Sequence, residues 1–137
     1  MRLHRLALLV LTSCAFPAIA GDVDPASLYE LSAAGTPARL KAGKAGTLVL
    51  EIKPRGEAHV SEESPLAVEL SGKNVKLGKE KLSRSDATAP RSPRFEVPMT
   101  AEQPGQGGVE VRATFFICTE NLCARQKKQL SIPVTVE

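Results

Sequence analysis

The chain has 137 residues, of which 42% are hydrophobic and 24% are charged, a composition typical of one small folded domain and not of a disordered chain. Aromatic residues make up only 4%, with no tryptophan, which argues against stacking platforms for single-stranded nucleic acid. Of the 18 basic side chains, Arg2 and Arg5 lie in the first twenty residues, and the remaining 16 face 15 acidic ones. We therefore expect no nucleic-acid partner.

Residues 1–20 have the pattern of a secretory signal peptide. Arg2 and Arg5 form a positive N-terminal region, residues 6–11 form a short apolar core, and Ala18-Ile19-Ala20 supplies the small residues that a signal peptidase needs. We predict that cleavage leaves a domain of residues 21–137.

The predicted location is periplasmic or secreted, an oxidising compartment in which cysteine pairs form disulfides. The less favoured alternative is a lipoprotein, because Leu11-Thr12-Ser13-Cys14 resembles a bacterial lipobox. No apolar stretch approaches the roughly 20 residues that a spanning helix needs. We therefore expect no transmembrane segment in the mature chain.

The pattern of residues 21–137 predicts an all-β domain. Alternating apolar residues and frequent Gly or Pro are typical of short antiparallel strands, and no window keeps the apolar stripe of a helix. The lysine-rich stretch 74–82 is typical of an edge strand protected by charge. We predict an antiparallel immunoglobulin-like β-sandwich of about seven or eight strands. The expected strands are 29–33, 47–53, 57–60, 66–70, 74–82, 94–99, 109–118 and 130–136, with a polar loop at 83–93 and a turn at 103–108.

Cys118 and Cys123 are the informative pair. The apolar alternation in residues 109–117 places Cys118 on the outer face of its strand, and the alternation in residues 130–136 places Cys123 on the same face. The cysteines should therefore oppose each other across a C-terminal hairpin and form a disulfide, provided that the pair is not hydrogen-bonded. The same register pairs Phe116 with Arg125, Thr114 with Lys127, Ile117 with Ala124 and Phe115 with Gln126, and predicts a tip that projects past the sandwich.

The sequence leaves the role of this disulfide open between two classes. Closing a loop of about six residues stabilises a fold by only about 2 kcal/mol, whereas an exposed bond at a tip is accessible to an attacking thiolate. Arg125, Lys127 and Lys128 follow Cys123 and would favour its thiolate form. One hypothesis is thiol–disulfide exchange, with Cys123 slightly preferred as the reactive sulfur. The other is a non-enzymatic binding or accessory domain with a structural disulfide.

His59 is the single histidine after residue 20. A zinc site needs four protein ligands, or three and a water, and a blue-copper centre needs two histidines, so we predict no metal and no cofactor. We interpret His59 as a turn histidine that hydrogen-bonds its loop; the alternative is a redox or metal partner of the cysteines.

Two segments together resemble a known family. Residues 115–123 (FFICTENLC) and 129–134 (QLSIPV) resemble the final hairpin of DsbD-type N-terminal domains, the periplasmic immunoglobulin-like domains of a transmembrane thiol–disulfide interchange reductase. Residues 56–66 (GEAHVSEESPL) resemble a His-hydrophobic-Asn-x-x-x-Pro turn that leads into a strand in the same group. The chain has one residue fewer between its cysteines than this family, and Ala124 where the family has tyrosine.

The resemblance implies that Cys118 and Cys123 are the exchanging pair. In that family the oxidised pair accepts electrons from a membrane-embedded relay and then reduces periplasmic partner proteins. The implied partner is another protein, either thioredoxin-like or a membrane thiol relay. Phe116 is the candidate for shielding the pair, and Arg125 is the candidate for tuning its charge.

Overall fold

The structure is a computed structural model that describes residues 23–137. The predicted signal peptide and Cys14 lie outside these residues. Within the described part of the chain, no helix is long and apolar enough to cross a membrane. The elements in chain order are η1 (Pro25–Leu28), β1 (Tyr29–Ser32), β2 (Arg39–Leu40), β3 (Ala45–Pro54), β4 (His59–Val60), β5 (Ala67–Lys73), β6 (Val75–Leu77), β7 (Lys81–Ser83), η2 (Arg84–Asp86), β8 (Arg94–Ala101), β9 (Gly105–Cys118) and β10 (Cys123–Val136).

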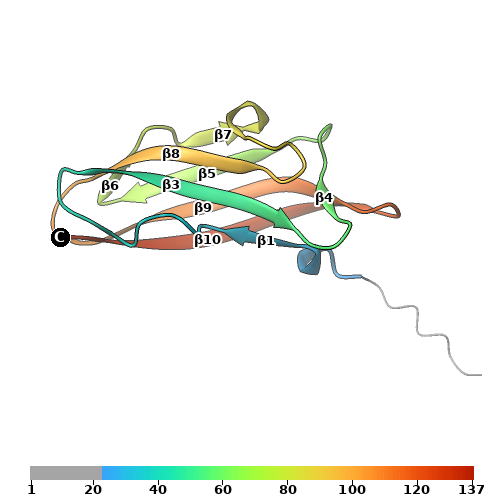
Figure 1. The fold of residues 1–137 in the computed structure, drawn as a ribbon, viewed down its shortest axis with the longest axis horizontal. Coiled ribbons are helices and arrows are strands. Elements are labelled where there is room, and N and C mark those ends of the chain that lie inside the picture. Colours follow the sequence, from blue (N-terminus) through green and yellow to red (C-terminus); the bar gives the residue numbers. More distant parts are fainter. Residues whose placement is uncertain (1–22) are drawn as a thin grey trace, which may run out of the picture.

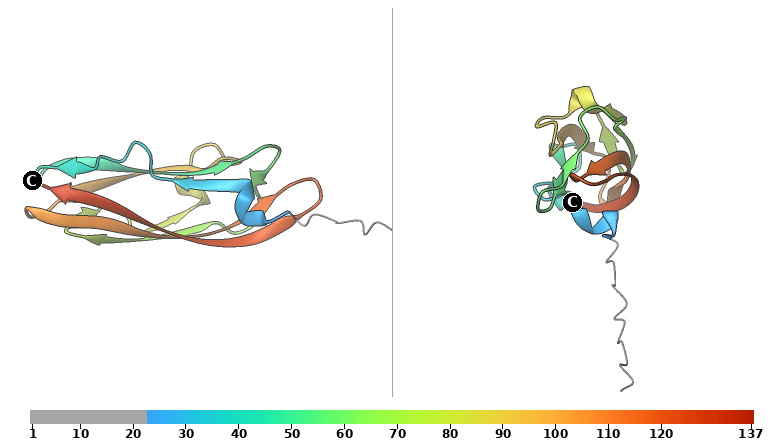
Figure 2. Two further views of the ribbon diagram at one scale, coloured as in Figure 1. Left: turned by 90° about the horizontal axis from the view of Figure 1, so that it is seen from below. Right: turned by 90° about the vertical axis from the view of Figure 1, so that its right-hand side faces the viewer.

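The strands form two stacked layers, which confirms the predicted all-β sandwich (Figures 1 and 2). One sheet has the order β1-β3-β8-β6, and the other has the order β2-β10-β9-β5-β7, with β4 pairing to β9. Four of the strands have only two or three residues, so the described residues hold more strands than expected. One of these, β2, was not predicted, and it pairs with β10 in parallel.

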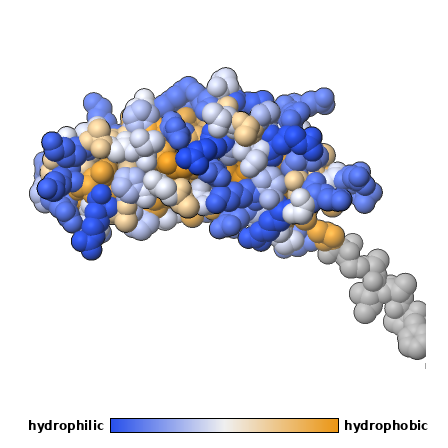
Figure 3. Space-filling model, in the orientation of Figure 1, coloured by the Kyte–Doolittle hydropathy of each residue, from blue (hydrophilic) through white to orange (hydrophobic). Residues whose placement is uncertain are grey.

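The core lies between the sheets and follows from the alternation of side chains along the strands. Along β3, Leu48, Leu50 and Ile52 are fully buried. The same inward pattern continues along β8 and β9, because successive side chains of a strand point to opposite faces. The surface in Figure 3 is correspondingly mostly hydrophilic, with hydrophobic residues visible in separated patches.

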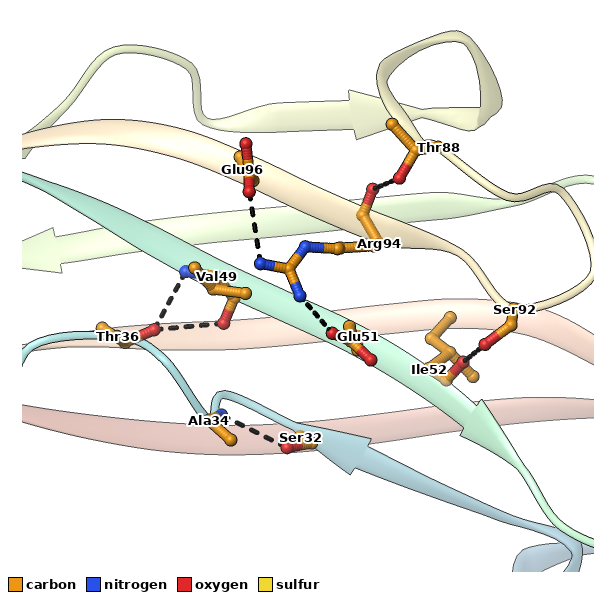
Figure 4. Close-up of polar contacts among 10 residues, drawn as sticks. All are labelled: Ser32, Ala34, Thr36, Val49, Glu51, Ile52, Thr88, Ser92, Arg94 and Glu96. Atoms are coloured by element: carbon orange, nitrogen blue, oxygen red, sulfur yellow. Dashed lines mark hydrogen bonds and ion pairs between the residues drawn. The ribbon is translucent and has the colours of Figure 1, made fainter.

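The outer face of the four-stranded sheet is held by polar contacts (Figure 4). Arg94 on β8 pairs with Glu51 on β3 and with Glu96 on its own strand. Both hydrogen bonds raise the pKa of the Arg94 guanidinium, and the bond to Glu51 has the larger effect. The Thr36 hydroxyl donates to the Val49 carbonyl and accepts from the Val49 amide, which fastens the β1–β2 connection to β3.

The stretch 74–82 was predicted to be one strand, but it forms two strands in different sheets. β6 pairs with β8, and β7 pairs with β5. The Gly78 amide still donates to the Pro98 carbonyl in the first sheet, whereas the Glu80 carbonyl accepts from the Leu70 amide in the second. The chain therefore crosses between the layers within these few residues. Both strands end their sheets, so the predicted edge position is confirmed.

The predicted turn at 103–108 is shorter than expected, because β9 begins at Gly105. A Cβ atom on Gly107 would lie 2.6 Å from the Lys73 carbonyl oxygen, and one on Gly108 would lie 2.6 Å from the Ile132 carbonyl oxygen. These glycines therefore permit a close approach of neighbouring backbones inside a sheet. Glycine in a strand interior often has this role, and from sequence alone it reads as a turn signal.

Candidate functional site

The β9–β10 hairpin has the predicted register. Cys118 is opposite Cys123, and the pair forms a disulfide with a Cα–Cα distance of 4.1 Å. The Thr119 amide donates to the Leu122 carbonyl at 2.8 Å just beyond the cysteines, so Cys118 and Cys123 occupy the adjacent non-hydrogen-bonded position, where side chains approach most closely. The predicted pairs Phe116–Arg125, Thr114–Lys127, Ile117–Ala124 and Phe115–Gln126 are all present.

The two sulfur-bearing residues share one face but differ in exposure. Cys123 is exposed, whereas Cys118 is only 3% exposed. The prediction that both cysteines would be accessible is therefore wrong for Cys118. Cys118 lies on β9 between β10 and β4, so it has a strand on each side. Cys123 lies on β10 and, among the described strands, has only β9 beside it at this level of the sheet.

The strand that flanks Cys118 is β4. Its register with β9 places His59 directly opposite Cys118 and Val60 opposite Ile117. Since opposed residues of an antiparallel pair point to the same face, His59 lies beside the disulfide on the outer face. The interpretation of His59 as a turn histidine is wrong, because the residue belongs to a strand.

Several contacts fix the two residues of β4. The Val60 side chain is fully buried, and its amide donates to the Arg91 carbonyl at 3.0 Å. The next amide, that of Ser61, donates to the Phe116 carbonyl at 2.9 Å. The backbone that carries His59 is therefore held from the core, from β9 and from the connection between η2 and β8.

Arg84 holds the loop between β4 and β5. Its Nη2 atom donates to the Ser61 carbonyl at 2.6 Å and also to the Ser64 carbonyl. The Ser61 and Ser64 hydroxyls are 2.9 Å apart and hydrogen-bonded. The sequence carried no signal for this role, because Arg84 lies 20 and 23 residues from its partners Ser64 and Ser61, in a stretch that reads as a polar loop.

Two aromatic residues pack together in the core near this end of the hairpin. Phe115 is fully buried, and its ring centroid lies 4.8 Å from that of Tyr29 in an edge-to-face arrangement. The Tyr29 hydroxyl donates to Gln126 Oε1 at 3.2 Å. Burial, and secondarily the charge of Asp24, raises the pKa of Tyr29. The β9 side of the hairpin thus packs into the core, and only the loop after Cys118 extends past the sandwich as predicted (Figure 1).

The outer face around Cys123 is basic. Arg125 and Lys127 are exposed on β10, and the half-buried Phe116 lies between Arg125 and the β4–β5 loop. A shallow groove follows the same face and is lined by residues of β5, β9 and β10, among them Ala67, Glu69, Arg112, Thr114 and Lys127. Among residues 23–137, no group of three or more His, Cys, Asp or Glu side chains is arranged to hold a metal ion.

Comparison with known proteins gives a limited result. No family model matches this chain, and no curated protein matches it. A matching solved structure is that of domains 4 and 5 of the S-layer protein SbsC, with 11% sequence identity and a TM-score of 0.46. The match covers 79% of this chain and 51% of the other, so the chain spans about half the length of that structure. A similarity at this level carries no statement on function.

Proposed function

We propose that this protein exchanges electrons with partner proteins through its Cys118–Cys123 disulfide. The observation that carries the proposal is the unequal exposure of the pair, with Cys123 open to solvent and Cys118 covered. Disulfide exchange needs one sulfur that an incoming thiolate can reach and a second that leaves. An outward-facing bond at the end of a hairpin supplies both.

The proposed reaction has two steps. A thiolate of the partner attacks Cys123 Sγ and forms a mixed disulfide, while the Cys118–Cys123 bond breaks and its electron pair moves to Cys118 Sγ. A second partner thiolate then attacks the partner's sulfur of the mixed disulfide and releases Cys123 as a thiolate. The partner is oxidised from a dithiol to a disulfide, and this protein is reduced to a dithiol; the reverse sequence reduces a partner.

The surroundings of Cys123 indicate what kind of partner fits. Arg125 and Lys127 lie on the same face of β10 and stabilise a thiolate at Cys123 electrostatically. Phe116, opposite Arg125, limits approach from the side of β9. We therefore infer a protein partner with an acidic rim around its own cysteine pair, of the thioredoxin-like or membrane-relay class that the family resemblance implies.

The second candidate is an accessory domain in which the disulfide is only structural. The observation that favours it is the burial of Cys118 at the end of a hairpin whose strands have 14 residues each. The reduction potential separates the candidates. A value below about −300 mV would mark a structural bond, and a value between about −120 and −270 mV would support exchange.

Trapping experiments test which sulfur the partner reaches. The Cys118→Ala variant keeps the exposed Cys123 thiol and should form a mixed disulfide with a thioredoxin-like protein that lacks its own resolving cysteine. The matched Cys123→Ala variant, which keeps only the covered thiol of this pair, should form far less. Equal trapping by both variants would contradict the proposed order of attack.

We also propose that the protein acts after export, in an oxidising compartment. The support is the signal-peptide pattern of residues 1–20. Mass spectrometry of the mature N-terminus should find Gly21 as the first residue. A diacylglyceryl group on Cys14 would instead identify the lipoprotein alternative.

A further inference from the structure

We propose that His59 is the acid–base partner of Cys118, the covered cysteine of the pair. The inference rests on the proposed exchange function and extends it to the residue that handles the proton. It follows from the register of β4, which pairs with β9 on the side away from β10 and places His59 directly opposite Cys118. On the β10 side of β9, Cys118 is opposite Cys123. The outer face therefore carries the row His59, Cys118, Cys123 across three neighbouring strands.

Distance and orientation favour a direct effect. Directly opposed residues of an antiparallel pair have Cβ atoms about 4.5–5.5 Å apart and side chains on one face. An imidazolium at such a distance from a cysteine favours the thiolate form. Imidazole is also the side chain that exchanges a proton most readily near neutral pH.

The placement of His59 is rigid. Val60 is fully buried opposite Ile117 and holds the strand to the core. Arg84 holds the following loop through the Ser61 carbonyl. The backbone of His59 is therefore fixed beside Cys118 by its neighbours on both sides.

In the proposed step, the partner's thiolate attacks Cys123 Sγ and the disulfide's electron pair moves to Cys118 Sγ. The His59 imidazolium stabilises this thiolate and transfers its proton to it, which leaves neutral imidazole and a neutral Cys118 thiol. In the reverse direction, neutral His59 removes the Cys118 proton. The resulting thiolate then attacks Cys123 Sγ in the mixed disulfide and expels the partner's thiolate.

Other charged groups on segments that pack against β4 must be distinguished from His59. Arg125 is the exposed cation on β10 nearest to the pair in register, and Arg84 binds the loop backbone. The exposed Arg125 acts through solvent, so its effect on Cys118 should be smaller and should fall with salt. The remaining charged residues of β3, β9 and β10 and of the loops beside β4 are Glu51, Lys53, Arg55, Glu57, Glu62, Glu63, Arg91, Glu110, Arg112, Glu120, Lys127 and Lys128.

The test follows the titration of each group by NMR, with the Cys118 Cβ shift and the His59 ring shifts as site-specific signals. In the Cys123→Ala background, His59→Gln should move the Cys118 titration to higher pH and lower its thiolate fraction at neutral pH by about tenfold, the effect of one nearby opposite charge. Arg125→Gln in the same background should produce a clearly smaller change. Unchanged Cys118 titration after His59→Gln, or equal effects of the two substitutions, would overturn the proposal.

A reciprocal measurement leaves His59 intact and guards against a misfolded variant. Because coupling between two sites is mutual, the His59 titration in Cys123→Ala should lie at higher pH than in a variant that lacks both cysteines. Identical His59 titrations in the two variants would overturn the proposal. A reduction potential in the range of structural disulfides would reject exchange itself without altering these titrations, so the two failures are distinguishable.

Discussion

Reduction of the Cys118–Cys123 bond, with no change in sequence, should lower the free energy of unfolding by only about 2 kcal/mol. The bond joins residues five apart in sequence, and the entropy lost by the unfolded chain grows with the length of the closed loop. The hairpin that it closes is already paired along both strands, as far as Gly105 and Val136. Reduction should therefore leave the native fold intact.

By linkage, the stabilisation of about 2 kcal/mol also fixes how far the reduction potential of the pair differs between the native and the unfolded protein. If the disulfide stabilises the fold by about 2 kcal/mol, the fold stabilises the disulfide equally, and about 30 mV corresponds to 1.4 kcal/mol for a two-electron couple. The native pair should thus have a potential only about 40 mV below that of the same pair in the unfolded chain. A fold that favours the disulfide by only this amount is compatible with the proposed exchange, in which the bond is made and broken repeatedly.

Two independent measurements check this prediction. Urea unfolding with and without a reductant gives the stability difference, and redox titration against a glutathione buffer in native and denaturing conditions gives the difference in potential. The Cys118→Ala, Cys123→Ala double variant serves as a control for the reductant. Complete unfolding on reduction, or a loss above about 4 kcal/mol, would refute the reasoning, since the loop-entropy account cannot supply it.

Three further predictions concern the contacts around the site. Phe115→Ala should lower the free energy of unfolding by about 3–5 kcal/mol in urea denaturation, because the ring is fully buried and lies against Tyr29. Tyr29→Phe should cost about 1 kcal/mol through loss of the hydrogen bond to Gln126. Tyr29 is the single tyrosine and burial raises its pKa, so in an absorbance titration of the native protein the phenolate should form at higher pH than in the unfolded chain. The stabilisation from the protonated Tyr29 hydroxyl is complete below the pKa of the unfolded state and is lost as the pH rises through the pKa of the folded state. Tyr29→Phe should abolish this pH dependence of the free energy of unfolding. Arg84→Ala should cost about 1–3 kcal/mol and accelerate amide hydrogen exchange at Ser61, whereas unchanged exchange would show that the Arg84 contacts are dispensable.

The faces of the long strands were predictable because burial imposes a period of two. The inward residues of 109–117 and 130–136 fixed which way each cysteine points, and their common hairpin fixed the pairing. The alternation and the short hairpin loop together therefore sufficed to predict the disulfide and the residue pairs next to it. The exposure of each cysteine was not predictable, because exposure depends on which strand lies beside β9.

The pairing of the short strands could not be predicted from the sequence, for a physical reason. Two or three residues carry too little alternation to reveal a partner, so neither the pairing of β2 with β10 nor that of β4 with β9 could be read from sequence. The stretch 74–82 shows the same limit, since its weak alternation gives no sign that the chain changes sheet between Gly78 and Glu80. Long-range pairing decides such segments, and local propensity does not.

The β4–β5 connection shows how an interruption in pairing can define the site. β5 ends its register with β9 at the pair Ala67–Thr114, and β4 resumes it at Val60–Ile117. β9 advances three residues between these pairs, whereas the partner chain uses seven, so the loop 61–66 contains four surplus residues. Because four is even, the surplus keeps the alternation, and the outward residues of β4 and β5 remain on one face.

The surplus also decides which charge faces Cys118. Continued without interruption, the β5 register of Ala67 with Thr114 would bring Glu63 opposite Cys118. A carboxylate there would disfavour a neighbouring thiolate by like-charge repulsion and would raise the barrier to releasing Cys118 from the disulfide. The loop instead sets Glu63 aside and brings His59 into that position. The irregularity in the sheet thus places beside Cys118, the sulfur proposed to leave, a group that can carry a positive charge instead of an anion.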